Sequence, residues 1–99
     1  MILEIAQIDV KPGSEVAFEA GVKEAAPLFN AAKGCHGLQL QRGIERPSSY
    51  ILVVRWATLE DHTVAFRESA AFTRWRELVG PCFAGPPQVQ HVEVVLGGD

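Results

Sequence analysis

Among the side chains suited to acid–base chemistry, His62 stands out. The pattern around it predicts that His62 lies in the first turn of a helix, on the apolar face that also carries Leu59 and Phe66. Burial and the positive end of the helix dipole both disfavour a charged imidazole, so a neutral base is expected there. A core histidine that is hydrogen-bonded to the backbone is the structural alternative.

Two further polar side chains could act together with His62. His91 lies in the last predicted strand, and it would meet His62 or Trp75 if its face of the strand looks toward the helices. Arg67 could reach a carboxylate or phenolate oxygen, although an arginine there could equally belong to a solvated helix face. The candidate catalytic residues are therefore His62, His91 and Arg67.

Aromatic side chains gather around the second predicted helix. Such residues at helical spacing commonly form a core, and they also line pockets for flat aromatic molecules. The candidate substrate-binding residues are Trp56, Phe66, Phe72, Trp75 and Tyr50.

Motifs for metals and nucleotides are missing from the sequence. It contains no GxGxxG, GxxxxGK[ST], HExxH, GxSxG or CxxC, which are the usual signatures of such sites. Cys35 and His36 are adjacent, but no second pair of ligands accompanies them. We therefore expect no metal site and no cofactor.

Length and charge limit the class of protein. The chain has 99 residues, which suits a single domain over residues 1–99, and a formal charge of −3 argues against nucleic-acid binding. No apolar run reaches the ~18 residues of a membrane span. The alternating N-terminus lacks the basic start of a signal peptide. With only two cysteines, the chain is expected to be a reduced cytoplasmic protein.

The apolar periodicity predicts six elements in the order β-α-β-β-α-β. Alternation marks the strands, helical spacing marks the helices, and Gly34 and Ser69 are expected to end the first helix and to break the second. The expected strands are 2–10, 38–46, 50–57 and 88–96, and the expected helices are 14–33 and 58–79. This order gives an α+β, ferredoxin-like antiparallel sheet with both helices on one face.

The strands carry apolar side chains on both of their faces. In the first strand, Ala6 and Ile8 share one face while Leu3 and Ile5 share the other. Helices cover only one side of such a sheet, so a second cover is required. We therefore expect a homodimer through the sheet face, which would also help so small a chain to hold a pocket.

Four short segments resemble the antibiotic biosynthesis monooxygenase family. They are 10–13 (VKPG), 56–62 (WATLEDH), 66–69 (FRES) and 72–76 (FTRWR). The resemblance extends from Ile2 to about Val95 and implies the dimeric α/β barrel, in which two ferredoxin-like sheets pack together. It also implies oxidation of phenols or dihydroquinones by O2 without flavin, metal or haem.

Related branches of that superfamily degrade haem or isomerise lactones. The haem-degrading branch places a histidine where this chain has Arg76, and an asparagine near Ala6. Many monooxygenase-like members carry a histidine at the position of Phe66, and His62 lies one helical turn earlier.

The resulting prediction is a cofactor-independent monooxygenase that acts on a small aromatic phenol, hydroquinone or polyketide-like substrate, with His62 as the base. The alternative is a non-catalytic ligand-binding or stress-response protein with the same dimeric barrel. A third candidate is an isomerase that moves a proton between two histidines.

Overall fold

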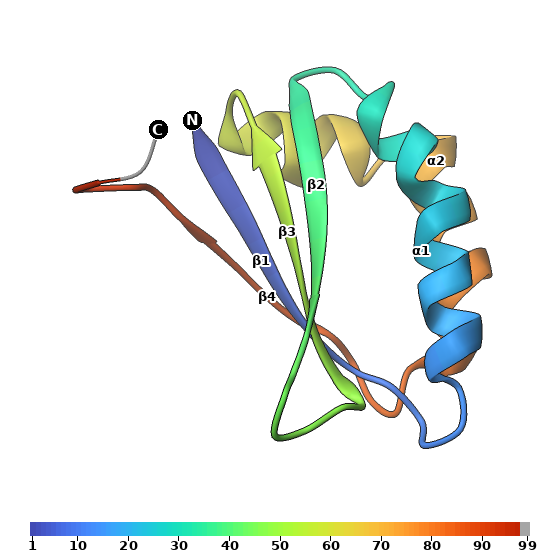
Figure 1. Cartoon of the computed structure of the whole chain (residues 1–99). Helices are drawn as coiled ribbons and strands as arrows, with labels where there is room; N and C mark the ends of the chain where they lie inside the picture. The colour runs from blue at the N-terminus through green and yellow to red at the C-terminus, as the bar shows by residue number, and fades with distance from the viewer. Residues whose placement is uncertain (98–99) are drawn as a thin grey trace.

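One antiparallel sheet with both helices on the same face makes up the molecule, and the computed structural model describes residues 1–97 (Figure 1). The strands lie in the order β2-β3-β1-β4, so each edge strand has one neighbour and the sheet of a single chain is open. The predicted β-α-β-β-α-β order and ferredoxin-like fold are confirmed. The elements are β1 (Ile2–Asp9), α1 (Glu15–Asn30), β2 (Cys35–Arg42), β3 (Ser49–Trp56), a π-helical turn η1 (Asp61–Phe66), α2 (Ala70–Val79), a short 3-10 turn η2 (Gly80–Cys82) and β4 (Gln88–Val92).

The two edge strands differ most from the sequence prediction. β2 begins earlier than expected because Cys35 already pairs with Trp56, with a register shift before Leu38. β4 ends at Val92, which pairs with Leu3 near the start of β1. The rest of the predicted strand has almost no β1 backbone left to bond. This C-terminal segment projects away from the sheet (Figure 1).

The apolar stripe predicted for the first helix forms the inner face of α1. Phe18, Val22, Ala25 and Phe29 are all buried there. The helix ends at Asn30, a few residues sooner than predicted. The chain then turns through Gly34 at φ +78°, where a Cβ atom would collide with the Asp61 carboxylate.

The second helical region breaks where the sequence suggested. The Ser69 hydroxyl accepts a hydrogen bond from the backbone N–H of Phe72 and starts α2. Before it, η1 turns widely, since the backbone N–H of Arg67 donates to the carbonyl of His62 at 3.2 Å. Such π turns are rare and frequently occur at functional sites. In η1, His62 is turned toward the interior.

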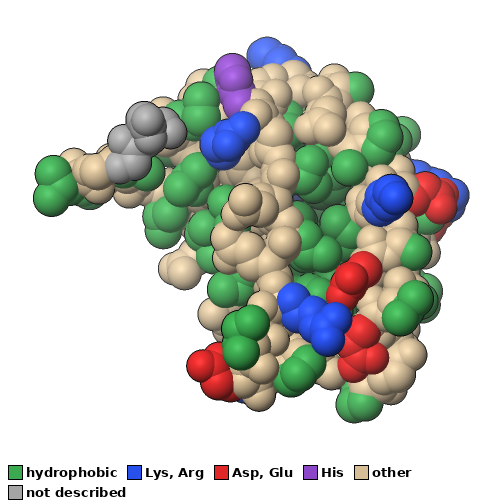
Figure 2. All heavy atoms as spheres, in the orientation of Figure 1, with side chains coloured by type: hydrophobic (Ala, Val, Ile, Leu, Met, Phe, Trp, Pro, Cys, Tyr) green, Lys and Arg blue, Asp and Glu red, His purple; other side chains and the backbone are tan. Residues whose placement is uncertain are grey.

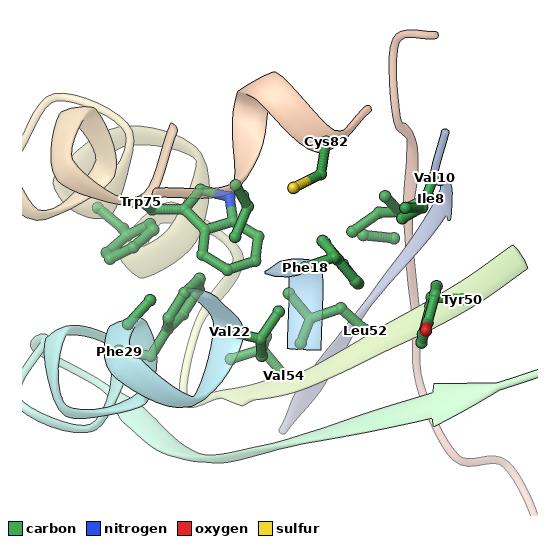
Figure 3. Close-up of a cluster of buried hydrophobic side chains, with 14 of the residues drawn as sticks. Ile8, Val10, Phe18, Val22, Phe29, Tyr50, Leu52, Val54, Trp75 and Cys82 are labelled. Atoms are coloured by element: carbon green, nitrogen blue, oxygen red, sulfur yellow. The ribbon is translucent and has the colours of Figure 1, made fainter. Parts of the chain in front are cut away.

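The core lies between the sheet and the helices. Figure 3 shows Phe18, Val22 and Phe29 of α1 gathered above Leu52 and Val54 of β3. Both cysteines are free, and Cys82 is buried, as expected of a small apolar side chain.

The other face of the sheet carries no helix. Leu3 and Ile5 of β1 lie on it beside Ile51 and Val53 of β3, and all four are half-buried. The central strands therefore carry apolar side chains on both faces, as predicted, whereas the edge strands place the exposed Gln39, Gln41 and Gln90 on the helix-free face.

Oppositely charged side chains pair on the outside of the helices. Figure 2 shows basic and acidic groups side by side on the helical part of the surface, and Arg74 pairs there with Glu24 at 3.2 Å. No helix within residues 1–97 combines the length and apolar character needed to cross a membrane.

Candidate active site

A hydrogen-bonded cluster of buried polar side chains lies under the helices. The Glu4 Oε1 atom is 3.3 Å from His62 Nε2 and accepts a hydrogen bond from Trp56 Nε1–H at 3.0 Å. His62 Nδ1 is 2.7 Å from His91 Nε2. Glu4 and His62 are only 5% and 2% exposed. Groups buried this deeply are retained only when they are hydrogen-bonded, which is the case for each of them.

Four elements bring this cluster together. Glu4 on β1 lies directly opposite His91 on β4, so both side chains point to the helix side of the sheet. Trp56 ends the buried row of β3. The turn η1 then places His62 against Trp56, with ring centroids 5.3 Å apart and nearly parallel planes.

One hydrogen bond joins the two imidazoles of the cluster. A neutral imidazole has one N–H donor and one nitrogen acceptor. In the 2.7 Å contact, one of His62 Nδ1 and His91 Nε2 donates its N–H and the other accepts. The other ring nitrogen of His62, Nε2, lies 3.3 Å from the Glu4 carboxylate. Each ring nitrogen of His62 therefore faces a polar partner.

Burial dominates the electrostatics of the cluster. Burial, together with the nearby charges of Arg67 and His91, lowers the pKa of His62 to about 4. Burial and Arg67 also lower the pKa of His91. Burial raises the pKa of Glu4, against the opposing effects of the Trp56 hydrogen bond and the Arg67 charge. Both imidazoles are consequently neutral at pH 7, and Glu4 is a more basic carboxylate than an exposed one.

A cavity of about 530 Å³ opens beside the cluster, between the sheet, α2 and the segment that leads into β4. This volume lies within the range of small-molecule sites. Its polar lining consists of Glu4, His62, Arg67 and Arg76. Its apolar lining consists of Ala6, Ile8, Leu52, Phe72, Trp75, Phe83, Pro86, Pro87 and Val89.

The structure brings together most of the residues proposed from the sequence. His62 and Arg67 line the cavity together with Phe72 and Trp75. His91 lies one hydrogen bond away from His62.

Trp56 and Phe66 lie beneath the cavity rather than on its wall. Trp56 stacks on His62, and Phe66 packs against both of these rings. Together they hold the imidazole in place.

Tyr50 is placed elsewhere. Its hydroxyl donates to Glu19 Oε2 at 2.6 Å. It contributes instead to a separate hollow of about 490 Å³, which is lined by polar side chains such as Gln41 and Arg42.

Glu4 and Arg76 were not recognised from the sequence. A signal for Glu4 existed, since it is the one charged side chain on a strand face that otherwise carries Ile2, Ala6 and Ile8. Arg76 could not be separated from neighbouring arginines on the same helix. Within residues 1–97, no group of three His, Cys, Asp or Glu side chains is arranged to hold a metal ion.

Comparison with known proteins agrees with this fold. The model of the antibiotic biosynthesis monooxygenase family matches residues 1–78. A Bacillus subtilis protein of uncharacterised function, YczJ, is 36% identical over 95 residues, covering 96% of this chain and 100% of its own.

Solved structures show the same architecture. One is a protein from Bordetella bronchiseptica that is described as a putative antibiotic biosynthesis monooxygenase. It is 59% identical to this chain with a TM-score of 0.95, and the match covers 96% of this chain and 97% of its own. SnoaB from Streptomyces nogalater, described as a cofactor-independent oxygenase, is only 14% identical, with a TM-score of 0.82 over 97% of this chain and 94% of its own. SnoaB therefore shares the fold.

These features define a ferredoxin-like α+β protein with a cavity between its sheet and its second helix. The chain belongs to the antibiotic biosynthesis monooxygenase family. Membership of this family supports monooxygenase activity, and so does the description of the similar Bordetella protein as a monooxygenase.

Proposed function

We propose that this protein is a cofactor-independent monooxygenase that oxidises a small phenol, hydroquinone or polyketide-like substrate with O2 in the 530 Å³ cavity. The observation that carries the proposal is the cluster of buried Glu4 and His62 with half-buried His91, beside a largely apolar cavity. Such a site offers an apolar wall to an aromatic ring and a proton acceptor next to it.

The chemistry needs a base and an enclosed space. The cluster accepts the phenolic proton, and the phenolate passes one electron to O2, which gives a phenoxyl radical and superoxide. The two radicals combine through a new C–O bond to form a peroxide anion, which takes the proton back from the cluster and becomes a hydroperoxide. Loss of water then breaks the O–O bond and removes the hydrogen from the same carbon. One oxygen atom of O2 ends in the quinone and the other ends in water.

Two arginines supply charge for this reaction. Arg67 and Arg76 both line the cavity, and neither forms an ion pair with the described residues. Their guanidinium groups would stabilise the developing phenolate. Phe72 and Trp75 supply the apolar wall against which an aromatic ring would pack.

Oxygen uptake with a panel of hydroquinones and anthrones tests the proposal. Because these compounds autoxidise, only a rate that scales with protein concentration counts. Replacing the imidazole in His62→Ala is expected to lower that rate at least about 100-fold, whereas His36→Ala, at an exposed histidine, leaves it unchanged. If no compound gives protein-dependent uptake, the non-catalytic ligand-binding alternative replaces this proposal.

The 2.7 Å contact between His62 and His91 also suits an isomerase that moves a proton within its substrate. That activity would need no oxygen. Turnover that proceeds equally well under argon would favour the isomerase.

We further propose that two copies pack through the helix-free face of the sheet. Leu3, Ile5, Ile51 and Val53 form an apolar patch there, and Val95 and Leu96 of the projecting C-terminal segment are more than 90% exposed. Figure 2 shows hydrophobic side chains on that segment. Burying such surfaces drives association.

Sedimentation tests the dimer. A chain of 10.8 kDa should sediment at about twice that mass at micromolar concentration. Val53→Glu should give the single-chain mass because it places a charge in the patch, whereas the surface substitution Glu24→Gln should not. A wild-type protein that sediments near 10.8 kDa would disprove the dimer.

A further inference from the structure

We infer that Glu4 is the catalytic base of the cavity, and that His62 and Trp56 are positioning residues which hold one of its oxygens. This inference rests on the proposed function and names the group that receives the substrate proton. It assigns to the carboxylate the role that the sequence suggested for the imidazole.

The two oxygens of Glu4 have different surroundings. Oε1 takes both the Trp56 hydrogen bond and the His62 contact. No donor among residues 1–97 bonds to Oε2. The structure leaves no buried side-chain nitrogen or oxygen atom of these residues without a partner, so Oε2 must reach open space. Glu4 lines the 530 Å³ cavity, and this is the space available to it.

His62 is less accessible to a ligand. Its Nε2 faces Glu4, its Nδ1 faces His91, and Trp56 stacks on its ring. A substrate hydroxyl could reach a nitrogen of this ring only by breaking one of those two contacts. Glu4 Oε2 requires no such rearrangement.

The surrounding charges suit proton transfer to Glu4. The titratable or charged groups that face it are His62, His91, Arg67 and Arg76. When the phenolic proton moves to Oε2, the negative charge moves from the carboxylate to the phenolate oxygen. The total charge of the cavity is unchanged, and the two arginines remain beside the new anion. The raised pKa of the buried carboxyl favours this transfer.

Binding of 4-nitrophenol without oxygen measures the transfer by itself. The phenolate of this probe absorbs at a longer wavelength than the phenol, so its ionisation is visible on binding. At pH 6 the wild type is expected to show the phenolate spectrum. Glu4→Gln, which retains the shape of the side chain, is expected to lower the bound phenolate fraction at least tenfold.

Two other variants sharpen the test. His62→Gln removes the imidazole but keeps a polar amide beside Glu4, and it is expected to keep most of the phenolate signal. Glu24→Gln, on the outer face of α1, serves as the matched control and leaves the spectrum unchanged. Circular dichroism checks that each variant is folded.

The outcomes separate this inference from the proposed function. Phenolate formation that survives Glu4→Gln, or that is lost in His62→Gln, overturns the inference, and so does a probe that fails to bind or to ionise in the wild type. If Glu4 ionises the probe but no compound supports protein-dependent oxygen uptake, the inference about Glu4 stands and the monooxygenase proposal fails.

Discussion

A hydrogen-bonded aromatic–glutamate pair lies at each end of the helix-facing row of β3. At one end the Tyr50 hydroxyl donates to Glu19 at 2.6 Å, and at the other end Trp56 Nε1–H donates to Glu4 at 3.0 Å. The Glu19 side chain is 44% exposed and also meets Arg42, whereas that of Glu4 is 7% exposed. The Tyr50 hydrogen bond lowers the pKa of Glu19, whereas burial raises that of Glu4.

Similar hydrogen bonds therefore accompany opposite pKa shifts. Each aromatic donor stabilises the charged carboxylate, but only at the buried end does loss of hydration outweigh that gain. At the exposed end, burial and Glu19 raise the pKa of Tyr50 to about 12, so the hydroxyl remains a donor at all ordinary pH values. The Glu19 pair has the properties of a structural link, and the Glu4 pair has those of a base.

The largest expected difference between the two pairs is in turnover. Glu4→Gln should lower protein-dependent oxygen uptake at least about 100-fold because it removes the proton acceptor. Glu19→Gln should leave the rate within about twofold, because its carboxylate lies outside the cavity. Steady-state oxygen consumption measures both rates. Equal losses of rate in the two variants would show that the Glu4 and Glu19 pairs do not differ in function.

Removing each aromatic donor should have unequal effects on stability. Trp56→Phe leaves a buried carboxylate without its hydrogen bond, which should lower the free energy of unfolding by about 1.5–3 kcal/mol. Tyr50→Phe should cost much less, because water and Arg42 still solvate Glu19. Urea denaturation compares the two variants with the wild type. A larger loss in Tyr50→Phe would contradict this prediction.

The smallest expected effect is the pH dependence of stability, which should have opposite signs at the two ends. Burial holds the pKa of Glu4 in the folded state above the ordinary value of 4.5, so its favourable contribution is present below pH 4.5 and is lost as the pH rises through the folded pKa. Glu4→Gln should therefore gain stability relative to the wild type as the pH rises above about 4.5.

Glu19 should show the reverse dependence. Its folded pKa is lowered from 4.5, so its contribution is present above that pH and is lost as the pH falls through the folded pKa. The advantage of the wild type over Glu19→Gln should shrink in acid. Urea titrations of both variants across this pH range measure the two trends, and parallel trends would contradict the comparison.

Much of the fold was readable from local pattern. The alternation in β1 and β3 and the stripe of α1 report periodic burial, which depends on neighbours in the sequence. The cap at Ser69 and the turn at Gly34 follow from local backbone chemistry as well. The ends of β2 and β4 were less predictable, because a strand extends only as far as its partner does.

The site was only partly readable. The sequence indicated that His62 is buried and that Arg67, Phe72 and Trp75 lie near it. It did not identify Glu4, because an alternating strand with one charged residue gives no sign of what that residue contacts. The partners of Glu4 are Trp56 at the C-terminal end of β3 and His62 in η1.

By itself, the amino-acid sequence determined the order of the elements, the apolar faces of the sheet and the side chains available for chemistry, because these follow from residue types and local spacing. Only the tertiary structure decided that His91 faces Glu4, that His62 lies between them, and that one carboxylate oxygen remains open to a cavity. Those features depend on strand register and on burial from water, and both arise only when distant segments of the chain pack together.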